Sequence, residues 1–442
     1  MCYNSKVLLG KYMFFQKTVP KNKLIPSEEL QMNIAVMGYG VVGSGVAEVL
    51  KKNHASIVKK SMQESLELTR ILDLRDFPGD ENEALLTKDF KDILNDESIG
   101  IVVETMGGVH PAYEFVLDCL KAGKSVVTSN KELVAAKGNE LLKVAEEKNV
   151  NFMFEASVGG GIPIIRPIIS CLAANEIDEI AGILNGTTNF ILTKMINDGM
   201  NFADALKIAQ ELGYAERDPS ADVEGKDACR KICILASLCF GKHVYPDSVY
   251  TEGITEIALA DVEYAKAWGG VIKLIGRATR YGDGKISAMV SPAFIQSHSQ
   301  LAGVDDVFNA ILVRGDAIGD VVFYGRGAGK LPTASAVVAD VIDCARHTER
   351  RKFFGWEDSV EDYVVDYLDI KHPFFVRAQA DDVAAAKQAV AAQFGDVQYL
   401  TYEGAAADEI GFITAALTQR EFDAKIAAAG VSVGSVIRVT DY

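Results

Sequence analysis

Residues 33–53, "NIAVMGYGVVGSGVAEVLKKN", combine a short apolar strand, a glycine-rich turn and an amphipathic helix. Gly38, Gly40 and Gly43 fit the pattern G-x-G-x-x-G. The first glycine permits a tight turn, the second lets a pyrophosphate approach the backbone, and the third allows close packing of helix on strand. The helix N-terminus then faces the phosphates. We predict that a dinucleotide cofactor contacts the turn residues Gly38, Tyr39, Gly40, Val41, Val42 and Gly43.

The following 100 residues repeat the alternation of strand and helix. Further strands are expected at 69–76, 99–108, 124–130 and 150–157, with helices at 111–122 and 131–148. Alternating strands and helices of this length indicate a parallel, doubly wound sheet. We therefore expect an α/β Rossmann-type nucleotide-binding domain over residues 32–157. A glycine turn without a nucleotide is the structural alternative, and the repeated units favour the cofactor.

The choice between NAD and NADP stays open at this point. Asp73, on the second expected strand, could hold a ribose 2′-hydroxyl, while Arg75 on the same strand face could meet a 2′-phosphate. Thr105 and Ser129 end neighbouring strands and are candidates for contact with the nicotinamide amide. Lys131 follows a strand at the edge where ligands of open sheets collect. A solvated lysine is the alternative, but cations are unfavourable at helix N-termini.

Residues 213–231, "GYAERDPSADVEGKDACRK", carry nine charged residues in nineteen and precede the apolar run 232–240. Such a stretch is either a solvated loop or a pocket for a small ligand that carries both charges. Asp227 and Lys231 are four residues apart and share one face of the helix that starts here. Burial lowers the pKa of a lysine and nearby carboxylates raise it, so the direction for Lys231 is not decided by the sequence.

Bulk composition excludes several classes of protein. A net charge of −16 argues against nucleic-acid binding, and no apolar run approaches the ~20 residues that span a membrane. Seven cysteines in 442 residues do not form a disulfide framework, so we expect a cytoplasmic protein. We expect residues 1–31 to be a disordered extension and Met32 to be the natural start.

Several long motifs then occur in order: "EASVGGGIPIIRP" (155–167), "GILNGTTNFIL" (182–192), "GYAERDPSADVEGKDACRKICILAS" (213–237) and "GRGAGKLPTASAVVADV" (325–341). Together with the dinucleotide turn, the chain from about residue 32 to residue 350 resembles homoserine dehydrogenase. The resemblance implies interconversion of L-homoserine and L-aspartate 4-semialdehyde with NADP or NAD. This step lies on the route to threonine, isoleucine and methionine.

The resemblance also assigns candidate site residues. Both substrates are zwitterionic amino acids, so their pocket needs carboxylates for the ammonium group and a proton donor for the reacting oxygen. By resemblance, Lys231 is the proton donor or acceptor and Lys131 a second catalytic lysine. The same resemblance makes Gly327 a cover for the cofactor and implies two further sets: substrate contacts at Glu216, Asp222 and Asp227, and a structural Na⁺ held by the Glu155 side chain with the carbonyls of Val158, Gly160 and Ile162. A plain interdomain turn is the alternative to the Na⁺ site.

The remaining chain predicts two more domains. Residues 158–324 read as an α+β catalytic and dimerisation domain, and helix 325–350 returns to the nucleotide domain. Residues 360–442 follow the order βαββαβ of a ferredoxin-like, ACT-like domain. Its usual effector loop is replaced by "ADDVAAAK" (380–387), whose acids suit a helix start. We expect a homodimer or homotetramer. A dehydrogenase acting through a cysteine thioester and a non-catalytic nucleotide sensor are the rival functions.

Overall fold

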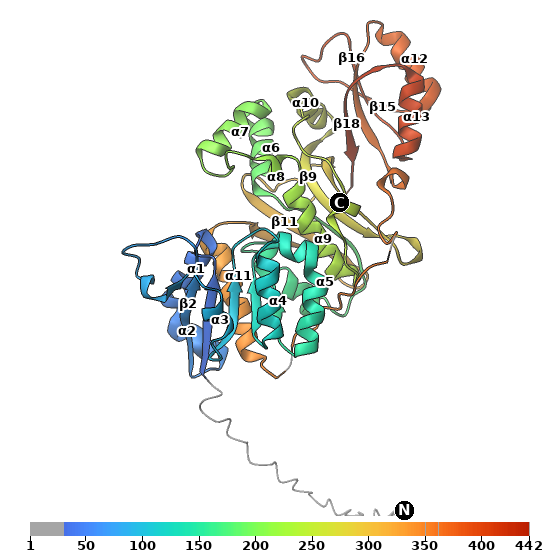
Figure 1. Ribbon diagram of the computed structural model, residues 1–442. Coiled ribbons are helices and arrows are strands. Elements are labelled where there is room, and N and C mark those ends of the chain that lie inside the picture. Colours follow the sequence, from blue (N-terminus) through green and yellow to red (C-terminus); the bar gives the residue numbers. More distant parts are fainter. Residues whose placement is uncertain (1–30, 350, 361, 442) are drawn as a thin grey trace, which may run out of the picture.

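The computed structural model describes residues 31–349, 351–360 and 362–441. The predicted extension lies outside the described residues, except that Gln31 already opens the first strand. Two large sheets organise the chain, a parallel one near the N-terminal end and a mixed one that reaches the C-terminal tail (Figure 1). Within the described residues, no helix is long and apolar enough to cross a membrane.

The first sheet confirms the predicted doubly wound domain. All its pairings are parallel, and its strand order is β3-β2-β1-β4-β5-β6. Chain order reverses between β1 and β4, which is where open α/β sheets bind ligands. The six strands are β1 (Gln31–Met37), β2 (Ser65–Leu72), β3 (Leu86–Thr87), β4 (Ile99–Glu104), β5 (Ser125–Thr128) and β6 (Phe152–Met153).

The second strand differs from its predicted range of 69–76. It begins at Ser65 and ends at Leu72, so Asp73 and Arg75 lie just beyond it rather than on one strand face. The Asp73 N–H still donates to the Thr87 carbonyl of β3 at 3.1 Å, while its carboxylate accepts the Tyr39 N–H of the glycine turn at 2.7 Å.

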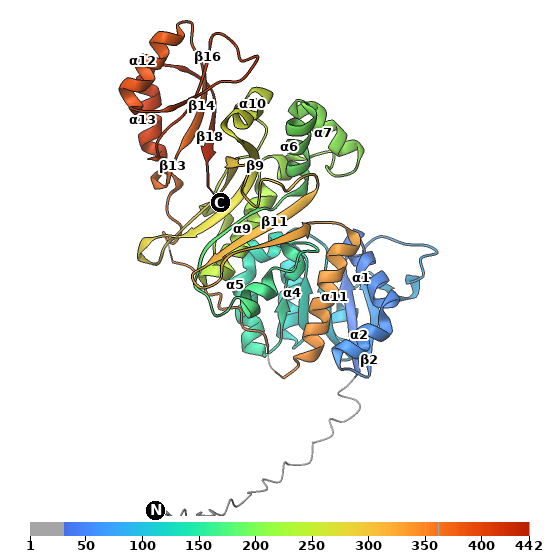
Figure 2. The same ribbon diagram turned by 180° about the vertical axis from the view of Figure 1, so that it is seen from behind.

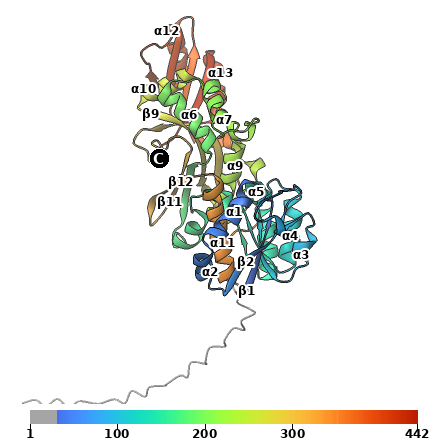
Figure 3. The same cartoon turned by 90° about the vertical axis from the view of Figure 1, so that its left-hand side faces the viewer.

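Helices cover both faces of this sheet (Figure 3). On one face lie α1 (Val41–Lys52), α2 (His54–Ser61) and the returning helix α11 (Lys330–Arg346), and on the other α3 (Lys91–Leu94), α4 (Ala112–Lys121) and α5 (Lys131–Lys148). Figure 2 shows α11 beside α1, although it is far away in sequence. Gly45 permits this close approach of the two helices, because a Cβ at this position would lie only 2.9 Å from Lys330 Cγ.

The middle part of the chain packs one long helix against antiparallel strands. β7 (Ile177–Ile183), β9 (Gly270–Arg280), β10 (Ile286–Gln296), β11 (Phe308–Gly315) and β12 (Gly319–Arg326) lie in the order β12-β11-β7-β9-β10, and β8 (Tyr250–Thr251) pairs with β10. The buried helix α9 (Lys226–Phe240) lies between these strands and α5. The same part of the chain contains α6 (Gly186–Asp198), α7 (Phe202–Glu211), α8 (Ser220–Val223), which contacts α9, and α10 (Leu259–Trp268).

The tail has the predicted βαββαβ order, with four antiparallel strands arranged β18-β14-β16-β15. Its elements are β14 (Phe374–Gln379), α12 (Val383–Phe394), β15 (Gln398–Leu400), β16 (Glu409–Ile413), α13 (Gln419–Ala429) and β18 (Ser432–Val439). As the sequence suggested, an acid caps its first helix: Asp382 accepts the N–H groups of Ala384 and Ala385, both at 3.0 Å. This confirms the ferredoxin-like order, while the ACT-like assignment stays a prediction.

The tail is less separate than the sequence suggested. β18 pairs in parallel with β10, so the tail strands extend the middle sheet into one ten-stranded sheet. Arg377 of the tail also forms a buried ion pair with Asp261 of α10, at 2.7 Å. Gly411 lets the ring of Tyr264 lie on the tail sheet, since a Cβ there would be 2.3 Å from Tyr264 Cε1.

Candidate active site

The contact between α5 and α9 brings two lysines onto one carboxylate. Lys131 is the first residue of α5, and its Nζ lies 2.9 Å from Asp227 Oδ1. Lys231 of α9 donates to the other oxygen, Oδ2, at 2.7 Å. Asp227 therefore bridges two ammonium groups that come from different parts of the fold. The predicted pairing of Asp227 with Lys231 on one helix face is confirmed.

Local backbone geometry places Asp227 at the start of α9. Gly225 precedes the helix at φ +82°, a left-handed conformation that glycine adopts readily. Asp227 consequently lies in the first turn, where the helix dipole favours an acid. One turn later, Lys231 also donates to the Leu184 carbonyl at 2.7 Å. Its ammonium is thus held by two acceptors in the interior.

Asn185 is a site residue that the sequence reasoning missed. Its side-chain oxygen caps α6 by accepting the Thr188 N–H, and its Nδ2 donates to Asp222 Oδ1 at 2.7 Å and to Asp227 Oδ2 at 2.8 Å. One amide therefore holds both predicted acids of the charged stretch in register. The available signal was an asparagine directly before a helix, within a motif already singled out.

Burial and charge separate the properties of the two lysines. Burial lowers the pKa of Lys231, against the attraction of Asp227. The charge of Asp227 raises the pKa of Lys131, whose side chain is 38% exposed. Burial alone would raise the pKa of Asp227, but the ammonium groups of Lys231 and Lys131 outweigh it and hold the pKa below its usual range. Lys231 is therefore the group that releases its proton more readily.

The other two predicted acids lie in different surroundings. Asp222, in α8, is partly buried, and burial together with the nearby charge of Asp227 raises its pKa. Glu216 is exposed on the turn between α7 and α8. In the described part of the chain, no hydrogen bond or ion pair joins its carboxylate to this cluster. Asp222 thus belongs to the cluster, and a substrate role for Glu216 stays a prediction.

A cavity of about 440 Å³ lies at the switch point of the first sheet. Its lining includes the glycine turn, the residues after β2 and the residues after β4: Gly38, Gly40, Leu72, Asp73, Leu74, Arg75, Lys88, Phe90, Thr105, Met106, Gly107, Pro111 and Phe115. The glycine turn, the adjacent helix start and this cavity together fit a dinucleotide, while the cofactor contacts of the individual residues stay predictions.

The surroundings of the turn require glycine at its first and third glycine positions. Gly38 has φ +93°, and a Cβ there would lie 3.0 Å from the backbone of Met106. A Cβ on Gly43 would lie 1.9 Å from the Gly38 carbonyl oxygen. The nearest atom to a Cβ on Gly40 would be Arg75 Nη2 at 4.0 Å, so this glycine borders open space. The first and third glycines close the turn, and the second leaves room beside the cavity.

The side chains between these glycines face different ways. Tyr39 is buried, and its hydroxyl donates to Asp80 Oδ1 at 3.1 Å rather than lining the cavity. Val41 is exposed and Val42 half-buried. Any cofactor contact of Tyr39 therefore comes from its backbone. The G-x-G-x-x-G pattern did not reveal that the Tyr39 side chain lies outside the cavity.

Thr105 and Ser129 lie at the ends of β4 and β5, as predicted. Thr105 Oγ1 donates to the Gly38 carbonyl at 2.8 Å and so braces the glycine turn. The Ser129 N–H donates to the Glu104 carbonyl at 3.3 Å. Both residues are half-buried. Ser129 is two residues before Lys131, so this end of the sheet lies next to the start of α5.

Two glycine segments pack on each other beside α11. A Cβ on Gly160 would lie 2.4 Å from the Gly327 carbonyl oxygen, and the Gly161 N–H donates to the Arg326 carbonyl at 3.0 Å. Gly327 itself is packed on Asn309, since a Cβ there would lie 2.2 Å from Nδ2. Gly327 therefore ties the middle strands to segment 159–161. Its predicted contact with a cofactor stays a prediction.

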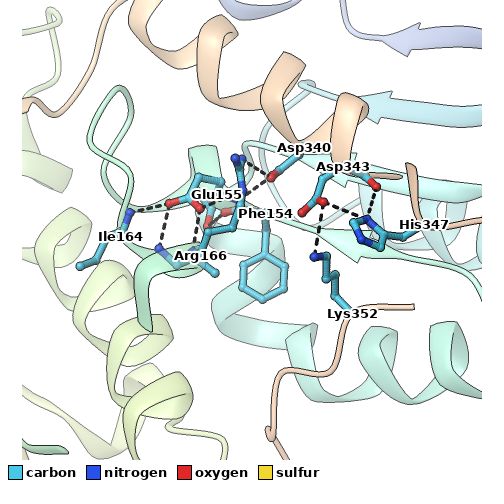
Figure 4. Close-up of polar contacts among 10 residues, drawn as sticks. Phe154, Glu155, Ile164, Arg166, Asp340, Asp343, His347 and Lys352 are labelled. Carbon is cyan, nitrogen blue, oxygen red and sulfur yellow. Dashed lines mark hydrogen bonds and ion pairs between the residues drawn. The ribbon is translucent and has the colours of Figure 1, made fainter. Parts of the chain in front are cut away.

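Glu155 has a different environment from the predicted cation ligand (Figure 4). Its carboxylate accepts the backbone N–H groups of Ile164, Ile165 and Arg166 at 2.6–2.9 Å. Three donors aimed at one carboxylate create a surrounding suited to an anion rather than to a bound cation. The observed contacts of this side chain fix the start of the segment 164–171, and the Na⁺ site stays a prediction.

Arg166 connects this segment to the returning helix. Its Nη2 donates to Asp340 Oδ1 of α11 at 2.6 Å, and Asp340 Oδ2 accepts the Glu155 N–H at 2.8 Å (Figure 4). Asp340 is completely buried, and burial raises its pKa to about 7 against the attraction of Arg166. The guanidinium is therefore the positive charge that the two buried acids share.

We predict that Arg166→Met lowers the stability of the fold. The variant leaves Asp340 and Glu155 buried without a shared cation, and because Arg166 is about one-third exposed we expect a loss of about 2 kcal/mol. The measurement is the thermal midpoint by circular dichroism, which should fall by several degrees. Arg420→Met, which removes two exposed ion pairs, with Asp366 and Asp369, is the matched control and should leave the midpoint almost unchanged. Equal midpoints for the two variants would contradict the prediction.

Comparison with known proteins gives one family. A family model described as homoserine dehydrogenase matches residues 163–342, and one described as the homoserine dehydrogenase NAD binding domain matches residues 38–155. A homoserine dehydrogenase of Neisseria gonorrhoeae is 44% identical over 320 residues, covering 72% of this chain and 73% of its own length.

Solved structures point the same way. The crystal structure of a homoserine dehydrogenase from Thiobacillus denitrificans has a TM-score of 0.83 at 36% identity and covers 93% of this chain and 98% of its own. A hyperthermophilic archaeal homoserine dehydrogenase in complex with NADPH has a TM-score of 0.60 at 29% identity, over 71% of this chain and 97% of its own.

Proposed function

The chain belongs to the homoserine dehydrogenase family, and from this premise we propose how its own residues divide the work. It is an NAD(P)-dependent oxidoreductase that interconverts L-homoserine and L-aspartate 4-semialdehyde in the biosynthesis of threonine, methionine and isoleucine. The carrying observation is the pair of lysines that meet on the buried Asp227 beside the cofactor domain.

Lys231 is the proposed proton-transfer group. Oxidation of an alcohol requires that the hydroxyl proton leave, and reduction of the aldehyde requires that one return. Burial lowers the pKa of Lys231, so its neutral form is more accessible than that of an exposed lysine. Asp227 and the Leu184 carbonyl fix the position of its Nζ. The bound nicotinamide cofactor supplies or accepts the hydride.

Lys131 and the acids are the proposed binding groups. Asp227 keeps Lys131 protonated, so a permanent positive charge faces the substrate carboxylate or its reacting oxygen. Asp222, held by Asn185, supplies a carboxylate for the substrate ammonium. Glu216 is a further proposed substrate contact, because it is exposed on the turn that precedes α8, the helix of Asp222, where a ligand enters from solvent.

Turnover distinguishes this enzyme from its two rivals. Initial rates with L-homoserine should appear with NADP⁺ or NAD⁺ as the only oxidant and should not require an added thiol or acyl acceptor. A nucleotide sensor would bind the cofactor without turnover. A thioester mechanism would lose activity when cysteines are replaced, and in the described chain the free cysteines near the site, Cys229 and Cys233, are both buried.

The surroundings of Asp73 and Arg75 favour NADP. Asp73 already accepts four hydrogen bonds, from the Tyr39 N–H at 2.7 Å and from the N–H, Nε and Nη2 of Arg75 at 2.9–3.0 Å. Its capacity to accept a ribose hydroxyl is therefore largely used. Arg75 and Lys88 place two cationic side chains at this end of the cavity, each already paired with one acid, Asp73 and the exposed Asp76 respectively. A 2′-phosphate would meet these charges.

We predict that Arg75→Ala weakens use of NADP⁺ selectively. Removing a guanidinium from a phosphate contact typically costs roughly 1.5–3 kcal/mol, so the KM for NADP⁺ should rise by roughly 10- to 100-fold. The KM for NAD⁺, which has no 2′-phosphate, should stay within about threefold. The measurement is a pair of KM determinations at saturating homoserine. If the KM values for NADP⁺ and NAD⁺ rose by the same factor, Arg75 would not contact a 2′-phosphate and would act only by holding Asp73.

For the Na⁺ site we propose fewer ligands than the resemblance implied. The Glu155 carboxylate is occupied by N–H donors, so a structural Na⁺ would depend on the carbonyl oxygens of Val158, Gly160 and Ile162. Hard cations take such oxygen ligands. No step of the reaction depends on it.

We further propose that the protein works in the cytoplasm as a homodimer or homotetramer. The free cysteines of the described chain fit a reducing compartment. β12 is an edge strand of the large sheet, and Tyr324 on it is 56% exposed. An open edge of this kind is commonly covered by a partner. The tail, which extends the same sheet, fits a role in assembly.

A further inference from the structure

Glu104 is a buried acid that the lysine cluster does not use. It ends β4, at the centre of the parallel sheet, and is completely buried. Its Oε2 accepts the Thr128 hydroxyl at 2.5 Å and its Oε1 accepts the Met106 N–H at 2.7 Å. The Gly107 N–H and Asn130 Nδ2 approach Oε1 at 3.4 and 3.5 Å. An acid that closes an apolar strand was the sequence signal for it.

Glu104 is surrounded by the hydrogen-bond donors that a carboxylate anion requires. Every partner is a donor, and the Thr128 oxygen already accepts the Asn130 N–H, so its own proton is directed to the carboxylate. Burial raises the pKa of Glu104, and the hydrogen bonds from Thr128 and Met106 oppose this. In the part of the chain that the structure describes, no lysine, arginine or histidine forms an ion pair with it.

Its position is between the cofactor cavity and the catalytic lysines. Met106 and Gly107, which it holds, line the cavity. Asn130, on its other side, caps α5 by accepting the Leu133 N–H, and α5 begins with Lys131. Asp73 and Arg75 mark the ribose end beyond β2, so the nicotinamide end lies on the β5 side, where hydride must reach a substrate held by the lysines.

We propose that Glu104 is a positioning residue that also acts electrostatically. It fixes loop 105–108 and Asn130, and its uncompensated charge favours the oxidised nicotinamide. The oxidised ring is cationic and the reduced ring neutral, so a nearby buried carboxylate binds the first better. This inference rests on the proposed function. It concerns whether the site binds the oxidised or the reduced cofactor more tightly. This preference is measured by cofactor binding in the absence of substrate.

The test compares Kd values for NADP⁺ and NADPH by isothermal titration calorimetry on the full chain. Glu104→Gln should weaken NADP⁺ binding about tenfold more than NADPH binding, because it removes the charge and keeps the size. Thr128→Val is the matched control: it removes a hydrogen bond to Glu104 but not the charge, so the ratio of the two Kd values should not change. Equal weakening of both cofactors in Glu104→Gln would overturn the proposal.

A second variant covers the case in which Glu104→Gln does not fold. Glu104→Asp keeps the charge and alters the hydrogen bonds, so both affinities should fall while their ratio stays that of the native protein. A roughly tenfold change of the ratio in this variant would overturn the proposal as well. Loss of homoserine turnover in the native protein would contradict the proposed function and leave these binding ratios unaffected, so the two failures are distinguishable.

Discussion

Lys231→Ala is expected to lower kcat by about 1,000-fold, near the middle of the range for loss of a general acid–base group. The alanine cannot take the hydroxyl proton of homoserine or return one to the aldehyde. Cofactor binding should be retained, because Lys231 contacts Asp227 and the Leu184 carbonyl rather than the glycine turn. The measurement is kcat in both directions, with the Kd of the cofactor determined separately.

Lys226→Ala is the matched control for this variant. Lys226 begins the same helix but is exposed, and it pairs with the exposed Glu224 at 2.5 Å. Its replacement should leave kcat within about twofold, as expected for an exposed ion pair. A nearly native kcat in Lys231→Ala would refute the assignment of the proton-transfer group. Loss of cofactor affinity alongside kcat would show that the helix had moved.

Asp227→Asn is expected to have the second large effect, lowering kcat/KM for homoserine by about 100- to 1,000-fold. The variant removes the charge that holds both ammonium groups, and a buried ion pair broken on one side typically costs roughly 3–5 kcal/mol. The asparagine keeps the shape and one acceptor oxygen. Its amide nitrogen, however, must take the place of Oδ1, to which Lys131 donates, or of Oδ2, to which Lys231 and Asn185 donate, so one donor always faces another.

The same variant should change the pH profile in a defined direction. Asp227 raises the pKa of Lys131 and opposes the lowering of that of Lys231 by burial, so both pKa values should fall when it is neutralised. Aldehyde reduction needs a protonated lysine, and its rate should therefore decline at lower pH than in the native enzyme. Glu224→Gln, an exposed acid one turn earlier, is the control and should leave the profile unchanged. An unshifted profile in Asp227→Asn would contradict the electrostatic role of this carboxylate.

Features that depend on neighbours along the chain could be predicted from the sequence. The G-x-G-x-x-G turn is an example, because Gly38 has the positive φ of a tight turn and a Cβ on Gly43 would lie 1.9 Å from the Gly38 carbonyl oxygen of the same turn. The shared face of Asp227 and Lys231 follows from helical spacing alone. The Asp382 cap could also be predicted, because its carboxylate accepts N–H groups that lie only two and three residues further along the chain. The alternation of strands and helices predicted the parallel sheet for the same reason.

Features that depend on packing between distant segments were decided only by the tertiary structure. Lys131 meets Asp227 because α5 packs on α9, and Asn185 joins two acids because α6 starts beside them. Whether the pKa of Lys231 is raised or lowered depends on how deeply α9 is buried, which is a property of the whole core.

The same limit explains two features that the sequence did not reveal. Glu155 resembles a cation ligand in its motif, yet the fold directs three N–H groups at it, and the tail joins the middle sheet through two residue pairs of β10 and β18. Hydrogen bonds and periodicity act within a few residues and can be read along the chain. Burial, charge coupling and sheet continuity are set by which surfaces come together, and that is determined only when the chain is folded.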